Sequence, residues 1–106
     1  MITEIVFFDL PDGISRDELM SKYLSTAEAW SKNEDLIEKH YFYDAERNQG
    51  GGVYVWRSKN AMIRWHGDEY KSRIKNIYGS EPRMTYFDSL VHVNNMLGTI
   101  ENFDPA

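Results

Sequence analysis

The chain has 106 residues, 42% of them hydrophobic and 14% aromatic, a composition that predicts one folded domain and excludes a disordered chain. Aspartate and glutamate outnumber lysine and arginine by 17 to 12, and because the resulting net charge of -5 is repelled by nucleic acids and anionic membranes, we expect neither as a partner. The absence of cysteine excludes disulfides and thiolate sites, and together with the lack of a leader-like or membrane-spanning apolar stretch it indicates a cytoplasmic protein.

The first half of the chain predicts a strand, a helix and a second strand. Residues 2–10 are rich in Ile, Val and Phe, which is typical of a strand buried on both faces. After a Pro-Asp-Gly turn, Ser15 and Glu18 have the spacing of a capping box, and apolar residues then recur at helical spacing to about Lys32. Residues 35–43 return to strand composition.

The second half repeats this pattern. Three consecutive glycines lead into a strand over residues 51–56, which pairs with the preceding strand as a hairpin. Ser58 is a good N-cap for a second helix, which Gly67 interrupts and Gly79 ends. Residues 84–93, rich in aromatic and β-branched side chains, predict a last strand.

The resulting order, β-α-β-β-α-β, predicts a ferredoxin-like α+β fold with a four-stranded antiparallel sheet and both helices on one face. The uncovered face of such a sheet should be polar, yet these strands are bulky and apolar on both faces. We therefore expect a homodimer in which two sheets pack together as a dimeric α+β barrel. Residues 1–93 are expected to form this domain, and residues 94–106 a C-terminal tail that packs on the dimer partner.

The aromatic content predicts a binding pocket. Three tryptophans and seven tyrosines exceed what a tight core of this size needs, and their polar atoms require partners. In the strand after the glycines, Tyr54 and Trp56 share one face. We expect a pocket between sheet and helices that binds a hydrophobic small molecule. The residues expected to line it are Trp30, Phe42, Tyr54, Trp56, Trp65 and Tyr70.

His40 is the candidate catalytic residue. Strand alternation places it on one face with Leu36 and Phe42, where it is expected to be partly buried. Two interpretations stay open: a core histidine that is hydrogen-bonded to a neighbour, or a general base in an apolar pocket. His40, His66 and His92 lack the spacing of a metal site, so we expect no metal.

An RNA-recognition motif has the same order of elements and carries aromatic rings on its central strands. Residues 5–10 and 51–56 resemble its two signatures in outline. However, Val6 offers no ring at the stacking position, Gln49 stands where the second signature begins with a basic residue, and the net charge has the wrong sign. RNA binding is therefore the least favoured alternative.

A more specific resemblance lies within residues 46–88. The matching positions are Glu46, Asn48, Gly51, Gly52, Val53, Tyr54, Ser58, Lys59, Ala61, residues 70–77, Gly79, Phe87 and Asp88. In these positions the chain resembles the YdhR-like mono-oxygenase family of the dimeric α+β barrel superfamily. The resemblance implies a dimer of ferredoxin-like units, each with a pocket between its sheet and helices.

Related antibiotic-biosynthesis mono-oxygenases oxidise polycyclic aromatic substrates with molecular oxygen and without metal or flavin, so the resemblance implies no cofactor. Their helix after the third strand carries Asn four residues before Trp. Here Trp65 matches the Trp, and Ala61 stands at the Asn position. Two functions therefore stay open: a cofactor-independent mono-oxygenase of aromatic or polyketide-like substrates with His40 as its base, or a non-catalytic protein that binds a fatty-acid-like or other lipophilic ligand.

Overall fold

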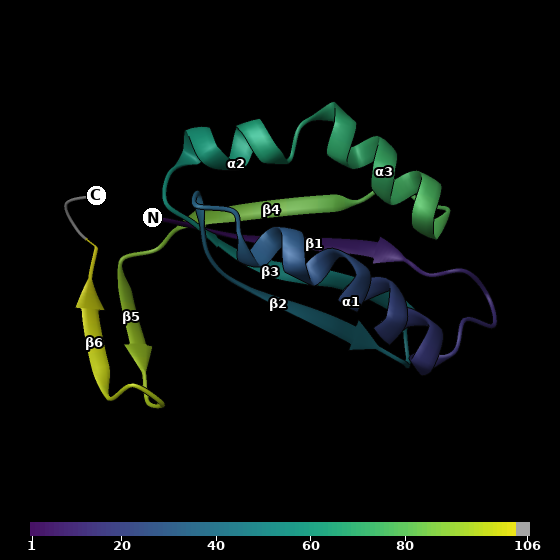
Figure 1. Cartoon of the computed structure of the whole chain (residues 1–106), viewed down its shortest axis with the longest axis horizontal. Coiled ribbons are helices and arrows are strands. Elements are labelled where there is room, and N and C mark those ends of the chain that lie inside the picture. Colours follow the sequence, from purple (N-terminus) through teal and green to yellow (C-terminus); the bar gives the residue numbers. More distant parts are fainter. Residues whose placement is uncertain (104–106) are drawn as a thin grey trace.

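The structure, a computed structural model, describes residues 1–103 and has two layers (Figure 1). Within this range, four antiparallel strands form the main sheet in the order β2-β3-β1-β4: β1 (Ile2–Asp9), β2 (Leu36–Asp44), β3 (Gln49–Trp56) and β4 (Arg83–Asp88). One face of this sheet is covered by α1 (Arg16–Ser31), α2 (Lys59–Trp65) and α3 (Asp68–Tyr78). The predicted α+β fold and its β-α-β-β-α-β order are confirmed, with the second helix divided in two.

The helices begin and end close to the predicted residues. The hydroxyls of Ser15 and Ser58 each accept a 3.1 Å hydrogen bond from the backbone amide three residues later. Gly67, where the second helix was expected to be interrupted, is the N-cap of α3, and Asp68 is its first helical residue. Gly79 ends α3 with a φ of +85°, as predicted. No helix among residues 1–103 combines the length and hydropathy needed to cross a membrane.

A β-bulge at the start of β2 changes which side chains share a face. Leu36 and Glu38 oppose consecutive residues of β3, so Ile37 is the extra residue. Leu36 therefore lies on the helix-covered face with Lys39, whereas His40 lies on the opposite, open face and is exposed. The expectation that His40 shares a face with Leu36 and is partly buried is wrong, because it assumed an unbroken alternation.

The core lies between the sheet and the helices. Tyr54 and Trp56 are 2% and 0% exposed beneath the helices, while Val53 and Val55 face the open side, so the alternation predicted for β3 is confirmed. Base stacking would require these two rings on the open face. The buried core consists of Ile2, Val6, Phe8, Leu10, Leu19, Tyr23, Tyr54, Trp56, Ala61, Met62, Tyr70, Ile74 and Tyr78.

The open face of the sheet also carries bulky apolar side chains, as the sequence predicted. Ile5 and Phe7 of β1 lie there beside Val53 and Val55 of β3. Phe7 packs against Phe42 of β2, with ring centroids 5.3 Å apart, and is still 36% exposed. A single copy of the chain therefore leaves these side chains partly in contact with water.

Gly51 allows a close approach at the centre of the sheet. Its φ is +156°, and a Cβ atom there would lie 1.8 Å from the carbonyl oxygen of Val6. The Gly51 amide donates a 3.0 Å hydrogen bond to the hydroxyl of Tyr23, which in turn donates one of 2.8 Å to the carbonyl of Phe42. The glycine run thus lets α1 be tied to β2 and β3 near the hairpin that joins them.

The C-terminal segment differs from the expectation. The strand predicted over residues 84–93 is interrupted after β4, and β5 (Val91–Asn94) pairs with β6 (Thr99–Asn102) in a separate hairpin that projects from the body (Figure 1). The predicted boundary at residue 93 lies inside this hairpin. Its apolar side chains are largely exposed, namely Val91, Val93, Met96, Leu97 and Ile100. Residues 104–106 of the predicted tail lie outside the described residues.

Candidate ligand-binding and active site

A cavity of about 750 Å³ lies above the sheet, with α1 on one side and α2 and α3 on the other. This volume is in the range of sites that bind drug-sized molecules. Ile74 and Ile77 of α3 contribute apolar walls. Eight aromatic residues also line it, namely Phe8, Tyr23, Trp30, Tyr41, Tyr54, Trp65, Tyr70 and Tyr78, together with polar and charged side chains such as Lys39, Arg64 and Arg73.

Of the six residues predicted to line a pocket, four line this cavity: Trp30, Tyr54, Trp65 and Tyr70. Trp56 lies behind the wall, fully buried, and stacks on Tyr54 with ring planes 1° apart and centroids separated by 5.6 Å. Phe42 lies on the open face of the sheet. Contact between a ligand and any of these residues stays a prediction.

His40 lies opposite Val53 on the open face, so the sheet separates its imidazole from the cavity. Its catalytic role stays a prediction, which a substitution described below tests. Within residues 1–103, no three His, Asp or Glu side chains come together in a group that could hold a metal ion.

Lys39 is a cavity residue that the sequence did not single out. Its ammonium nitrogen lies 3.7 Å from the ring centroid of Tyr41, 4.5 Å from that of Tyr54 and 4.9 Å from that of Trp30. Burial lowers the pKa of Lys39 to about 7, so the amine is partly neutral near neutral pH and can accept a proton. Its alternation with Tyr41 along β2 was the signal available in the sequence.

A buried pair, Glu4 and His66, lies behind the cavity wall and was also missed. The imidazole Nδ1 of His66 lies 2.5 Å from Glu4 Oε1, and the indole of Trp56 donates a 3.0 Å hydrogen bond to the same oxygen. The side chains of His66 and Glu4 are 1% and 3% exposed. Since a carboxylate only accepts, neutral His66 carries its proton on Nδ1, and within residues 1–103 its Nε2 has no hydrogen-bond partner.

The ring of His66 supports the aromatic wall. It stacks on Tyr70 with centroids 3.8 Å apart, and it meets the edges of Tyr54 and Trp30 at 4.4 Å and 5.7 Å. Desolvation lowers the pKa of His66, against the opposing effect of its hydrogen bond to Glu4. A charged residue on the buried face of an apolar strand, as Glu4 is, was the signal from which this pair could have been suspected.

Tyr54 and Tyr70 place two phenol groups at the cavity. Their hydroxyl oxygens are 3.1 Å apart and share a hydrogen bond. Burial raises the pKa of both, and for Tyr54 the neighbouring Tyr70 raises it further. Both phenols therefore stay protonated at neutral pH, and the one that accepts in this pair can donate its own proton to an oxygen atom of a ligand.

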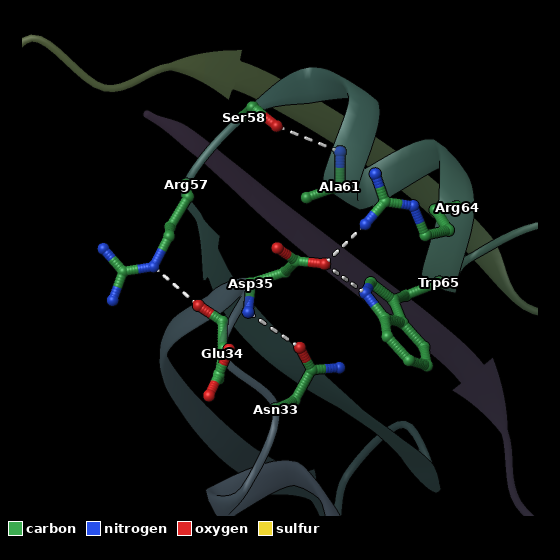
Figure 2. A network of polar contacts seen from close by, with 8 residues as sticks. All are labelled: Asn33, Glu34, Asp35, Arg57, Ser58, Ala61, Arg64 and Trp65. Carbon is green, nitrogen blue, oxygen red and sulfur yellow. Dashed lines mark hydrogen bonds and ion pairs between the residues drawn. The ribbon is translucent and has the colours of Figure 1, made fainter.

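Asp35 organises the rim of the cavity, at the junction of α1 and β2 (Figure 2). Its Oδ2 accepts hydrogen bonds of 2.9 Å from the indole of Trp65 and 2.8 Å from Arg64. Its amide donates one of 2.9 Å to Asn33 Oδ1, and its carbonyl accepts one of 3.0 Å from the Arg57 amide. The end of α2 is thus tied to the start of β2, which orients Trp65, itself 40% exposed, at the rim.

The fold and this cavity define an α+β protein with an aromatic-lined site between its sheet and its helices. No family model matches the chain, and no curated protein matches it. Among solved structures, the chain is similar to SnoaB, a cofactor-independent oxygenase from Streptomyces nogalater, in the crystal structure of a single-residue mutant. The sequence identity is 14%, the TM-score is 0.61, and the match covers 83% of this chain and 91% of that chain. At this identity the likeness shows the fold alone.

Proposed function

We propose that the protein binds a hydrophobic aromatic molecule in the cavity and oxidises it with molecular oxygen, without a bound cofactor. The observation that carries this proposal is the aromatic-lined cavity of about 750 Å³, in a fold shared with a cofactor-independent oxygenase. The aromatic part of the lining suits this chemistry, because apolar rings around a carbanion limit its protonation by water.

The expected substrate has a CH₂ group activated by neighbouring rings and a carbonyl, as in an anthrone. A base removes a proton from this carbon, and the enolate that forms transfers an electron to O₂. The two radicals combine into a peroxide, which takes up the proton and eliminates water to leave a ketone. One oxygen atom enters the product and the other enters water, so the reaction needs no further reductant.

Lys39 is the base in this proposal. Its amine lines the cavity, and burial lowers its pKa to about 7, so a neutral fraction is present to accept the proton. The ammonium that results stabilises the enolate. The hydrogen-bonded phenols of Tyr54 and Tyr70 supply one free O–H donor for the substrate oxygen. His40, the base predicted from the sequence, lies on the open face.

Oxygen uptake with anthrone and with a hydroquinone tests this function. The rate of autoxidation without protein is the background that is subtracted. Lys39→Met and His40→Ala separate the two candidate bases. We expect Lys39→Met to lose about 10²-fold or more of the rate, the usual contribution of a general base. A larger loss in His40→Ala than in Lys39→Met would return that role to His40. The absence of uptake above background with both substrates would refute the oxygenase function.

Ligand binding without chemistry is the second candidate. Ala61 is 2% exposed and offers no polar group on α2, at the position where the related mono-oxygenases carry an amide. The cavity would then hold a fatty-acid-like or polyketide-like molecule. Mass spectrometry of ligands that co-purify with the protein tests this function. A lipophilic ligand recovered unchanged after incubation in air, with no oxygen uptake, would favour it.

We also propose that a second copy of the chain covers the open face of the sheet. The support is that Ile5, Phe7, Val53 and Val55 place apolar side chains on this face, opposite the helices. A two-fold contact between identical faces would bury this surface in both copies at once. The exposed apolar side chains of the β5–β6 hairpin offer further contact area to the same partner.

A further inference from the structure

The cavity carries two cationic side chains without acidic partners, although the chain as a whole has a net charge of -5. Lys39 on β2 and Arg73 on α3 both line it, and within residues 1–103 neither forms an ion pair. By contrast, Arg64 at the rim is paired with Asp35 at 2.8 Å. The cavity therefore has unmatched positive charge beside its aromatic walls.

The surroundings of Lys39 lack the anion that a desolvated ammonium requires. Its ammonium nitrogen instead lies over three aromatic rings, at 3.7, 4.5 and 4.9 Å from the centroids of Tyr41, Tyr54 and Trp30. Ring faces attract a cation but compensate only part of the cost of removing it from water. The lowered pKa of Lys39 reflects this uncompensated burial. An anion bound beside the ammonium would raise this pKa again, because it would favour the charged form.

The acidic groups near Lys39 are engaged elsewhere or exposed, so a ligand is left to supply the anion that pairs with its ammonium. Glu4 on β1 already accepts hydrogen bonds from His66 and Trp56, and Asp35 at the rim is engaged by Arg64 and Trp65. Glu34, also at the rim, is exposed. The other titratable groups that line the cavity are Tyr23 on α1, Lys32 just after α1, Tyr41 on β2, Tyr54 on β3, and Tyr70, Arg73 and Tyr78 on α3, and Lys32 is already paired with Glu28.

We propose that the cavity selects anionic aromatic ligands, which carry a carboxylate or phenolate oxygen on a ring system, and that Lys39 determines this specificity by pairing with that oxygen. The inference rests on the proposed function, because such an anion carries the same charge as the enolate that Lys39 would form in this cavity and then pair with as an ammonium. The three rings around the ammonium contact the aromatic part of the ligand, and the ammonium contacts its oxygen. Binding of an aromatic anion thus supplies the counter-charge that the protein lacks.

Two probes of nearly equal shape test this inference by isothermal titration calorimetry at neutral pH. One is 2-naphthoate, an anion, and the other is 2-naphthamide, which is neutral. We expect the native protein to bind the naphthoate roughly tenfold more tightly, as for a hydrogen bond to a charged group. Lys39→Met should bring the ratio of affinities close to one, and Lys39→Arg should preserve the preference because it keeps the charge. Lys71→Met, the same change on the exposed face of α3, is the control.

Equal affinity of the native protein for the two probes would overturn the inference, and so would a preference that survives in Lys39→Met or a failure of both probes to bind. Circular dichroism verifies that each variant is folded. The outcome is distinguishable from that of the proposed function. Tighter binding of the anion without oxygen uptake would support the inference and refute the oxygenase function. Oxygen uptake together with equal affinities for the two probes would support the oxygenase function and refute the inference.

Discussion

Glu4 and His66, which are 62 residues apart in the chain, form a buried hydrogen-bonded pair directly behind the aromatic wall of the cavity. The pair connects β1 to the junction of α2 and α3. One oxygen of Glu4 accepts hydrogen bonds from both His66 and Trp56. His66 stacks on Tyr70 and Trp56 stacks on Tyr54, so Glu4 holds the two side chains that support these cavity-wall rings. Glu4 is therefore a positioning residue for the site as well as part of the core.

Replacing the buried carboxylate should destabilise the fold. Glu4→Gln keeps the size of the side chain but weakens the hydrogen bonds to His66 and Trp56, and we expect a loss of about 1–3 kcal/mol in the free energy of unfolding. Urea unfolding followed by tryptophan fluorescence measures this loss. Glu69→Gln, an exposed change on α3, is the control and should stay within about 0.5 kcal/mol. Equal effects of the two changes would show that the pair does not stabilise the fold.

Stability should decrease on mild acidification because of His66. Desolvation lowers the pKa of this imidazole in the folded state below its ordinary value of 6.5, so the unfolded chain binds more protons in that range. The contribution is complete above about pH 6.5 and is lost as the pH falls below it, by up to roughly 1.4 kcal/mol per pH unit. Urea midpoints across this range measure the slope. His66→Gln should flatten it, and an unchanged slope in that variant would assign the effect to other groups.

A methyl group at Gly51 should be among the most damaging small changes in the chain. It would lie 1.8 Å from the Val6 carbonyl oxygen, and backbone cannot move aside as a flexible side chain can. We expect Gly51→Ala to cost more than about 3 kcal/mol in the free energy of unfolding. Gly67→Ala is the matched control, because its nearest new contact is 3.5 Å, and it should cost under about 1 kcal/mol. Comparable losses would mean that the sheet can accommodate a side chain at Gly51.

Local patterns were sufficient to predict the fold. The Ser15 and Ser58 caps, the glycine at the end of α3 and the alternation in β3 each depend on neighbouring residues, and the structure confirms them. From these elements the order of strands and helices follows, and this order admits few topologies. The aromatic composition also pointed to the region where the cavity lies.

The rest depended on interactions that no local pattern records. Because Ile37 is an extra residue in β2, Leu36 lies on the face opposite to the one that simple alternation assigns it relative to His40. Nothing in the neighbouring sequence marks Ile37 as a bulge. This change of face misled the interpretation of His40. The contact between Glu4 and His66 joins distant segments, so it requires the folded chain. The break after β4 has no glycine or proline to announce it, since Ser89 and Leu90 occupy it.

The rate of oxygen uptake should rise with pH through about 7 and then level off. Only the neutral form of Lys39 accepts a proton, and its pKa of about 7 sets the midpoint of the rise. The measurement is kcat/KM for anthrone across the range, with the protein-free rate subtracted at each pH. Lys39→Arg separates two roles, because it should lose the uptake and still bind 2-naphthoate. A rate independent of pH in this range would exclude Lys39 as the base.

The proposed dimer predicts that a charge on the open face will produce monomers. Phe87 on β4 lies opposite Thr3 on this face and is 54% exposed, so Phe87→Glu should leave the single chain folded. Buried against a second sheet, however, the new carboxylate would lack a partner in each copy, which is costly in a contact between identical faces. Light scattering after size exclusion, at micromolar concentration, should give a dimer for the native protein and a monomer for the variant. Ile100→Glu, on the 78% exposed hairpin side chain, tests whether the hairpin contributes to the same contact. A native protein that is monomeric under these conditions would contradict the dimer, and the apolar open face would then need another partner.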